Sequence, residues 1–271
     1  MADWLTIRRG AAPLVVSLPH TGTEIPEDCQ TGLVSLWLAR RDADWWIDTL
    51  YDFAAGMDAT VVHTAISRTV IDVNRDPSGV SLYPGQATTE LCPTTTFDGE
   101  LLYEEGREPS VEEIERRKAR YHAPYHEALK AEIARLRAIH PTVVVYDCHS
   151  IRSRIPRLFE GELPVFNIGT NSGLSCAPDL QARIEAVTAA SGFPSVSNGR
   201  FKGGYITRSL GAPEAGIHAV QMELACRAYM PEPESMPTPE AWPTPYDAAY
   251  TDPLRENLKA ILTACLGFAE A

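Results

Sequence analysis

The architecture follows most directly from the segment Thr142-Val-Val-Val-Tyr146-Asp147-Cys148-His149-Ser150. Four β-branched residues and a tyrosine in a row are typical of a strand covered on both faces, as in a mostly parallel sheet. In an open α/β sheet, ligands bind at the carboxyl end of such strands. His149, with Asp147 two residues before it, is therefore placed to hold a metal, although a polar strand end that only caps a loop would have the same pattern.

A second apolar run, Pro13-Leu-Val-Val-Ser-Leu18, also ends in a histidine, because Pro19-His20-Thr21-Gly22 follows it directly. The small residues after His20 allow the chain to turn sharply. One histidine in such a place is usually an ordinary loop residue. Two strand-end histidines on two buried strands favour a shared site.

Three further segments supply charged groups to such a site. Asp44 lies at the start of a predicted helix, where it could be an N-cap or a carboxylate directed at a metal. Residues 66–77 alternate like a strand and would present Arg68 and Arg75, either for a bidentate grip on a carboxylate or as surface partners of nearby aspartates. Glu223 ends the predicted strand 217–224, and a buried carboxylate there indicates either catalysis or a salt bridge, for instance to Arg227.

The remaining segments complete a predicted single domain over residues 1–271, with further strands at 59–64 and 164–169. Residues 78–109 are rich in Gly, Pro and Thr and are predicted to form a lid or binding loop. A helix is predicted from Ser110 to Ile139, bent or divided at Pro124. It carries His122 and His126 at i and i+4, for which substrate contact or packing is favoured over metal binding.

The composition limits the possible partners. The net charge of −12 over 271 residues argues against nucleic acid and anionic membranes as partners and leaves a small-molecule substrate. The six scattered cysteines indicate free thiols in a reducing compartment. The sequence contains neither a signal peptide nor an apolar run long enough to span a membrane, so we expect a cytoplasmic protein.

Together these groups predict metal-assisted hydrolysis. A catalytic zinc commonly takes three protein ligands and leaves one position for water, whose pKa it lowers to about 7. A carboxylate adds general base and acid catalysis, and an arginine stabilises the developing oxyanion. His20, His149 and an acid, Asp44 or Glu24, would supply the ligands, and the candidates for the other two functions are Glu223 and the arginines Arg68 and Arg75.

Several motifs carry a resemblance to known families, broadly to the zinc carboxypeptidase and aspartoacylase superfamily. More closely, the chain resembles the N-formylglutamate amidohydrolase family in four segments: Leu18-Pro-His-Thr-Gly22, Ser67-Arg-Thr-Val-Ile-Asp-Val-Asn-Arg75, Pro124-Tyr-His126 and Tyr146-Asp-Cys-His-Ser150. The resemblance implies hydrolysis of N-formyl-L-glutamate to formate and L-glutamate in histidine degradation. It also implies a phosphorylase/hydrolase-like fold, a three-layer α/β/α arrangement around a mixed sheet.

The resemblance also implies roles for particular residues. His20 and His149 match metal ligands, and the implied ion is one divalent metal, with zinc preferred. Carboxypeptidases take a further ligand from an HxxE motif, but the third residue after His20 is Thr23. We therefore expect Asp44 as the third ligand, with Glu24 in reserve.

On the catalytic side, Glu223 matches the general base and Arg68 the arginine beside the oxyanion. Asn74 and Arg75 match the pair that grips the substrate carboxylate. N-formylglutamate has a second carboxylate, and we expect Lys202 or Arg208, from the glycine-rich segment after residue 198, to bind it.

Three alternatives stay open at this point. The enzyme could deacylate another N-acyl amino acid or act as a carboxypeptidase-like amidase. A thiol amidase could use Cys148 beside His149, although adjacent strand residues point to opposite faces. Outside enzymes, the chain could be a metal-dependent binding protein for acidic metabolites.

Overall fold

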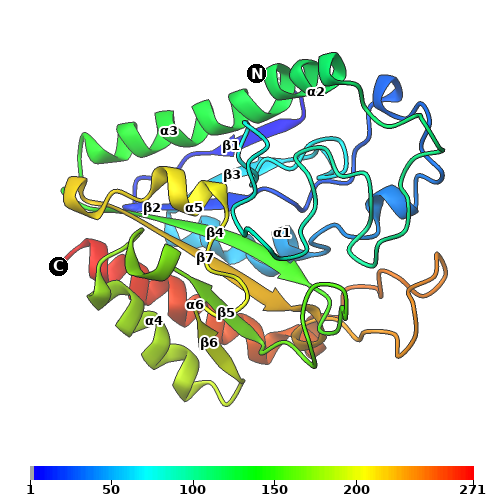
Figure 1. Cartoon of the computed structure of the whole chain (residues 1–271). Helices are drawn as coiled ribbons and strands as arrows, with labels where there is room; N and C mark the ends of the chain where they lie inside the picture. Colours follow the sequence, from blue (N-terminus) through cyan, green and yellow to red (C-terminus); the bar gives the residue numbers. More distant parts are fainter. Residues whose placement is uncertain (1–2) are drawn as a thin grey trace.

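A seven-stranded mixed sheet forms the centre of the structure, a computed structural model that describes residues 3–271. The strands lie in the order β1-β3-β2-β4-β7-β5-β6 (Figure 1). The central strands β3, β2, β4 and β7 are parallel, whereas β1 and β5 pair antiparallel with β3 and β7. The bounds are β1 (Leu5–Arg8), β2 (Leu14–Leu18), β3 (Thr60–Thr64), β4 (Val143–Ile151), β5 (Phe166–Gly169), β6 (Ser195–Ser197) and β7 (Ile217–Ala225).

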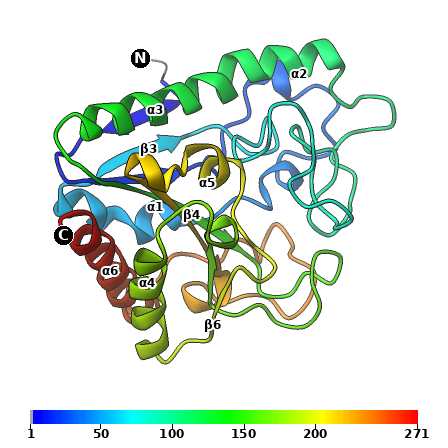
Figure 2. The same ribbon diagram turned by 60° about the vertical axis from the view of Figure 1, so that its left-hand side comes forward.

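Helices cover both faces of this sheet, as Figure 1 and Figure 2 show. The helices α2, α3 and α5 lie over one face, and α1, α4 and α6 lie over the other. Their bounds are α1 (Ile47–Leu50), α2 (Val111–Arg117), α3 (Ala123–Arg137), α4 (Pro178–Ala190), α5 (Tyr205–Leu210) and α6 (Ala248–Ala269). The predicted α/β class with a mostly parallel mixed sheet between helices is confirmed.

The central position of β4 in the sheet explains why its sequence is apolar without alternation. Val144, Tyr146 and Cys148 pack into the core beneath α4 and α6. Val143 and Val145 pack into the opposite core, beneath α3. Because both faces of a central parallel strand are covered, both sets of side chains are apolar. Asp147 and His149 continue the second set, so they lie on the α3 side of the sheet at its carboxyl edge.

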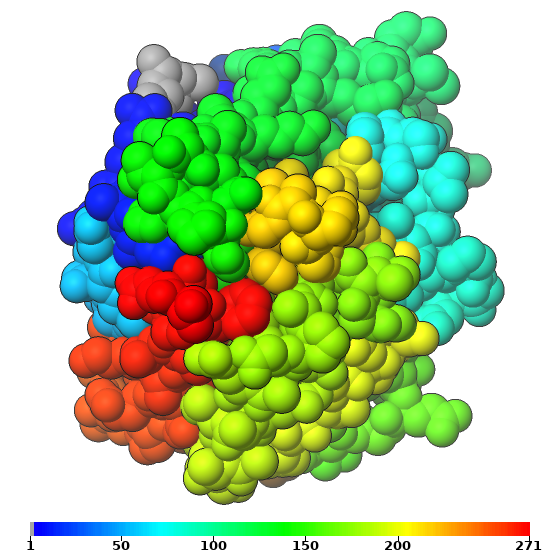
Figure 3. Space-filling view, turned by 90° about the vertical axis from the view of Figure 1, so that its left-hand side faces the viewer, coloured from blue at the N-terminus to red at the C-terminus, as the bar shows by residue number. Residues whose placement is uncertain are grey.

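The opposite edge of the sheet carries the amino ends of β4 and β7. Figure 3 looks onto this edge, where the end of α6 (red) lies beside α4 and the turn that precedes β7. Arg183 of α4 donates there to the carbonyl oxygen of Gly267 in α6 at 3.1 Å. The candidate site residues lie away from this face, toward the carboxyl ends of the strands.

Several predicted elements differ in detail. Residues 66–77 form turns and not a strand, and the helix predicted near Asp44 is reduced to α1 after Trp46, whose φ of 63° is left-handed. The helix predicted over residues 110–139 is divided by a π-helical turn at Lys118–His122, just before Pro124. Pro124 has no N–H to donate, which accounts for the altered hydrogen-bond pattern there. Residues 78–109 contain isolated bridges but no regular strand or helix, and their role as a lid stays a prediction.

Candidate metal centre

The two strand-end histidines meet because β2 and β4 are parallel neighbours. Ser17 of β2 lies opposite Asp147 of β4, so His20 and His149 follow at the same edge of the sheet. Their ring centroids are 4.7 Å apart, and their Nδ1 atoms are 3.1 Å apart. The turn after His20 needs Gly22, since a Cβ atom there would lie 2.3 Å from the backbone of Ala65.

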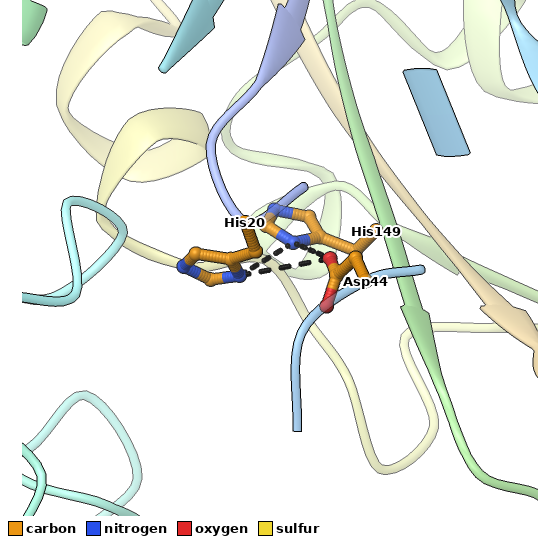
Figure 4. Close-up of side chains that lie close together, drawn as sticks. All are labelled: His20, Asp44 and His149. Atoms are coloured by element: carbon orange, nitrogen blue, oxygen red, sulfur yellow. Dashed lines mark hydrogen bonds and ion pairs between the residues drawn. The ribbon is translucent and has the colours of Figure 1, made fainter. Parts of the chain in front are cut away.

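Asp44 is brought to the same point by the backbone. Its N–H donates to the carbonyl oxygen of His20 at 2.9 Å, just before the left-handed turn at Trp46. One carboxylate oxygen, Oδ2, then lies 3.1 Å from Nδ1 of His149 and 3.7 Å from Nδ1 of His20 (Figure 4). All three side chains are buried. The reserve ligand Glu24 is exposed and lies outside this group.

The outer nitrogens of both rings are held by further carboxylates. Nε2 of His20 lies 2.7 Å from Asp72, and Nε2 of His149 lies 2.9 Å from Asp147. An ionised carboxylate only accepts, so each Nε2 donates to its carboxylate, and Nδ1 is the atom that a neutral ring leaves for an ion. The two Nδ1 atoms and Oδ2 of Asp44 face one another. Backing of metal-bound histidines by carboxylates is a common arrangement, and this donor set fits a divalent ion such as zinc.

The electrostatics of the group also favour a cation. Burial by itself would lower the pKa of His149, but Asp147 and Asp44 outweigh burial and hold this pKa well above its usual value. Burial raises the pKa of Asp44, yet the two histidines bring it below its ordinary range. Three carboxylates thus surround two imidazoles. The excess negative charge that favours a proton on His149 equally favours a metal ion between the rings.

A cavity opens directly beside the two histidines and encloses about 570 Å³ of empty space, part of it open to solvent. Its lining includes every catalytic side chain expected from the sequence, together with the expected Asn74 and Arg75. Additional lining residues come from segment 83–97, the loop after β4 and the loop after β6: Tyr83, Ala87, Thr88, Thr89, Phe97, Leu158, Arg200 and Phe201.

Glu223 reaches the cavity because β7 is the next parallel strand. It lies opposite His149 in the pairing of β4 with β7. Burial raises the pKa of Glu223 to about 7, against the opposing effect of the positively charged His149. The alternative partner Arg227 is engaged elsewhere, with Ser153 at 2.8 Å and Glu162 at 3.3 Å. Glu223 is therefore a carboxyl group able to take and release a proton near neutral pH.

Arg68 and Arg75 both reach the cavity although their segment is not a strand. Arg68 donates to Asp72 at 2.8 Å and lies 3.6 Å from Asp44, with its guanidinium 4.8 Å from the ring centre of Phe97. Arg75 lies 3.6 Å from Asp72 and donates to Thr89 at 3.2 Å. The turns at 67–75 place both arginines around Asp72. In an extended strand, residues 68 and 75 would lie too far apart to contact the same carboxylate.

Asn74 is fixed by several contacts at the wall of the cavity. Its Oδ1 accepts from the N–H of Ile206 at 2.8 Å, and its Nδ2 donates to Asp147 at 3.3 Å. The fit against α5 is close, because a Cβ atom on Gly204 would lie 2.4 Å from Nδ2 of Asn74. Asn74 thereby connects the start of α5 to the carboxylate behind His149.

The helix pair His122 and His126 is engaged with the backbone on either side of Asn74. Nε2 of His126 donates to the carbonyl of Val73 at 2.7 Å, and Nε2 of His122 donates to that of Arg75 at 2.9 Å. Burial lowers the pKa of both histidines, that of His126 to about 3. Within residues 3–271 no acid or thiol joins them in a three-ligand group. Their contacts indicate a structural role, because the two rings hold the backbone on both sides of Asn74. We call this pair the clamp.

The structure places neither Lys202 nor Arg208 on the cavity lining, and it places Arg200 there instead. Lys202 is exposed. Arg208 donates to the carbonyl of Gly203 at 2.9 Å on the flank of Tyr83. The chain turns after β6 through Asn198, with a φ of 52°, and Arg200, two residues later, lines the cavity. Arg200 belongs to the segment that was expected to supply a cation, but nothing in the sequence distinguished residue 200 from residue 202.

Cys148 lies in the core beneath α4 and α6, on the face of β4 opposite to His149. Burial holds the pKa of its thiol well above the usual value. A thiolate nucleophile at this position is therefore disfavoured. No helix within the described residues 3–271 has the length and apolar character needed to cross a bilayer.

Fold and site together define an α/β protein whose parallel strands converge on a candidate metal centre beside an arginine-lined cavity. The model of the N-formylglutamate amidohydrolase family matches residues 12–230. An N-formylglutamate deformylase of Pseudomonas aeruginosa is 49% identical over 233 residues, covering 86% of this chain and 87% of that protein. One of Pseudomonas putida is 44% identical over 265 residues, covering 97% and 96%.

Among solved structures, the crystal structure of N-formylglutamate amidohydrolase from Ralstonia eutropha superposes with a TM-score of 0.77 at 23% sequence identity, covering 98% of each chain. At this identity the likeness concerns the fold. The chain belongs to the N-formylglutamate amidohydrolase family, and the resemblance noted from its motifs is confirmed.

Proposed function

We propose that this chain is a metal-dependent amidohydrolase that cleaves N-formyl-L-glutamate to formate and L-glutamate. The observation that carries the proposal is the convergence of His20, Asp44 and His149 beside a cavity that also contains Glu223. The two Pseudomonas relatives, named as deformylases of this compound, support the choice of substrate.

His20, Asp44 and His149 are the proposed ligands of one divalent ion, and zinc suits their nitrogen and oxygen donors. When bound, such an ion lowers the pKa of a coordinated water and polarises a carbonyl oxygen. Asp72 and Asp147 contact Nε2 of the two rings, so Nδ1 of each ring would hold the ion.

Glu223 is the proposed general base and acid. Its carboxylate takes a proton from the attacking water and then gives one to the amide nitrogen as the C–N bond breaks, so that the amino acid leaves as an amine. A pKa of about 7 suits both transfers at neutral pH. Arg68, held in place by Asp72, donates to the oxygen of the formyl group as negative charge develops there.

Asn74 and Arg75 are the proposed contacts for the α-carboxylate of the substrate. Arg75 offers a planar guanidinium suited to a carboxylate, and Thr89 and Asp72 orient it. Asn74 lines the same wall between Arg75 and His149.

We place the reaction in histidine degradation in the cytoplasm and treat residues 1–271 as a single catalytic domain. Six free cysteines, all buried, agree with a reducing compartment. Segment 78–109, which contributes Tyr83, Thr89 and Phe97 to the cavity lining, is the proposed lid.

The test is formate release from N-formyl-L-glutamate, measured with metal content before and after chelation. We expect activity that falls with removal of the metal and returns with zinc. Glu223→Gln should keep the metal, while kcat falls by about 10² to 10⁴-fold. Tight binding of the substrate without formate release would instead favour the binding-protein alternative. Faster turnover of N-acetyl or N-succinyl derivatives would favour a different deacylase.

A further inference from the structure

Arg200 has a fixed position in the cavity. Its Nε donates to the carbonyl oxygen of Leu158 at 2.8 Å, and its Nη2 donates to that of Ala87 at 2.8 Å. The guanidinium carbon lies 5.5 Å from the ring centre of Tyr83 and 5.3 Å from that of Phe201. Two carbonyls and two aromatic rings therefore hold the planar group before any ligand arrives.

Arg200 differs from the other two arginines of the cavity in its charged partners. Arg68 and Arg75 both lie within 4 Å of Asp72, whereas Arg200 forms no ion pair with any residue in the described range 3–271. Its Nη1 donates to no protein atom in that range. Burial, together with the like charge of Arg75, lowers the pKa of Arg200, although Tyr83 and Glu223 act in the opposite direction. A half-buried guanidinium with no direct ion pair, facing a cavity, favours an anion as the occupant.

The surroundings of Arg200 suit a side-chain carboxylate attached to a short aliphatic stem. Leu158 and Phe201 provide apolar walls beside it, and Arg75 and Arg68 lie on the same cavity nearer to the histidines. We propose that Arg200 binds the distal carboxylate of the substrate and thereby sets a preference for acidic over neutral N-formyl amino acids. This inference rests on the proposed function.

Arg200 also donates to the carbonyl oxygen of Ala87 and so stabilises that loop. A test must therefore distinguish binding of the substrate carboxylate from stabilisation of the loop. The separation comes from two substrates, N-formyl-L-glutamate and N-formyl-L-glutamine, which differ only in the charge and donors of the distal group. Loss of loop support would lower kcat/KM for both substrates equally. Loss of a carboxylate contact would lower kcat/KM for the first alone.

The experiment compares wild type, Arg200→Gln and Arg200→Lys, with Arg208→Gln as the matched control. Arg208 also stacks on Tyr83, at 5.1 Å, but does not line the cavity. We expect wild type to prefer N-formylglutamate. We expect Arg200→Gln to lose about 10- to 100-fold in kcat/KM for that substrate, the size of a charge-assisted contact, with little change for N-formylglutamine. Arg208→Gln should keep the wild-type ratio.

An equal fall for both substrates in Arg200→Gln, or no preference in wild type, would overturn the inference while leaving the amidohydrolase intact. A wild-type protein that releases formate from neither substrate would instead overturn the proposed function. If Arg200→Gln does not fold, as judged by thermal melting, Arg200→Lys carries the test. A lysine cannot form a bidentate contact, so the ratio should fall, and an unchanged ratio would count against Arg200.

Discussion

Two pairs of histidines lie in close contact in this structure, and they differ in almost everything except their spacing. The ring centroids are 4.7 Å apart for His20 and His149 and 4.5 Å apart for His122 and His126. The first pair is backed by carboxylates and has its Nδ1 atoms turned together. The second donates to two backbone carbonyls. The groups opposite each ring, and not the residue type or spacing, separate a candidate metal centre from a clamp.

The pKa values of the two pairs differ in the same direction as their partners. Asp147 and Asp44 hold the pKa of His149 well above its usual value, while burial without an acid lowers that of His126 to about 3. A neutral imidazole carries one N–H, and in His126 the carbonyl oxygen of Val73 places it on Nε2, which donates to that oxygen. Two histidines of one protein thus respond oppositely to being buried, because only one of them has carboxylates for neighbours.

The largest expected effect comes from His149→Ala. Removing one of three proposed ligands should abolish stable metal binding and lower kcat/KM by about 10³-fold or more, since a metal ion supplies several kcal/mol of stabilisation to the transition state. The measurement is formate release together with metal content. Full activity with a full complement of metal in this variant would remove the distinction between the two pairs.

A smaller effect is expected from Asp147→Asn, which keeps the shape of the group behind His149 but removes its charge. Metal affinity should fall by about 10- to 100-fold, as is typical for loss of a carboxylate behind a ligand histidine. Competition with a zinc-binding dye measures the affinity. An unchanged affinity would show that Asp147 does not act through the ring of His149.

The clamp is tested by His126→Ala. We expect metal content to stay at the wild-type level while KM rises about fivefold, because one hydrogen bond of about 1 kcal/mol no longer holds the backbone beside Asn74. His140→Ala is the matched control, since His140 also donates to a backbone carbonyl but does not line the cavity. Loss of metal in His126→Ala would assign this pair to a metal site after all.

The last expected effect concerns stability and not activity, and it is a pH dependence of unfolding. The pKa of His126 is about 3 in the folded chain and near 6.5 when unfolded, so below pH 6.5 the unfolded chain binds a proton that the folded chain does not. Stability from this group is therefore present above pH 6.5 and is lost as the pH falls. The variant His126→Ala should have a lower free energy of unfolding than wild type at pH 7. Measured by urea unfolding, this difference should shrink by up to about 2 kcal/mol at pH 5. A difference that is the same at both pH values would contradict a neutral, buried His126.

The two pairs also indicate what could be predicted from the sequence. His20 and His149 were predictable because each directly follows an apolar run, and neighbouring parallel strands end at one edge of a sheet. The carboxylate backing of His20 was not, since Asp72 lies 52 residues away in a segment that alternates like a strand but folds as turns. For the same reason the spacing of His122 and His126 could not reveal that both rings donate to carbonyls beside Asn74.

Arg200, the proposed contact for the second carboxylate, shows the corresponding limit of sequence-based prediction. The glycine-rich segment after residue 198 was expected to carry a cationic side chain for the second carboxylate, and Lys202 and Arg208 were the residues expected. Which side chain of such a segment turns inward depends on one left-handed residue, Asn198, and on packing against Tyr83. Neither leaves a pattern in the sequence.

The order of β2, β4 and β7 has a consequence for how much the rest of the chain can vary. These adjacent strands bring His20, His149 and Glu223 to one edge, so the spacing of the three side chains depends on the interval between paired strands, about 4.8 Å. The segments after β2 and β3 are less free to vary, because they carry Asp44, Arg68 and Arg75. Loops that carry none of these groups can be lengthened or trimmed while the reacting groups keep their separation, and new specificities can arise by exchange of such loops.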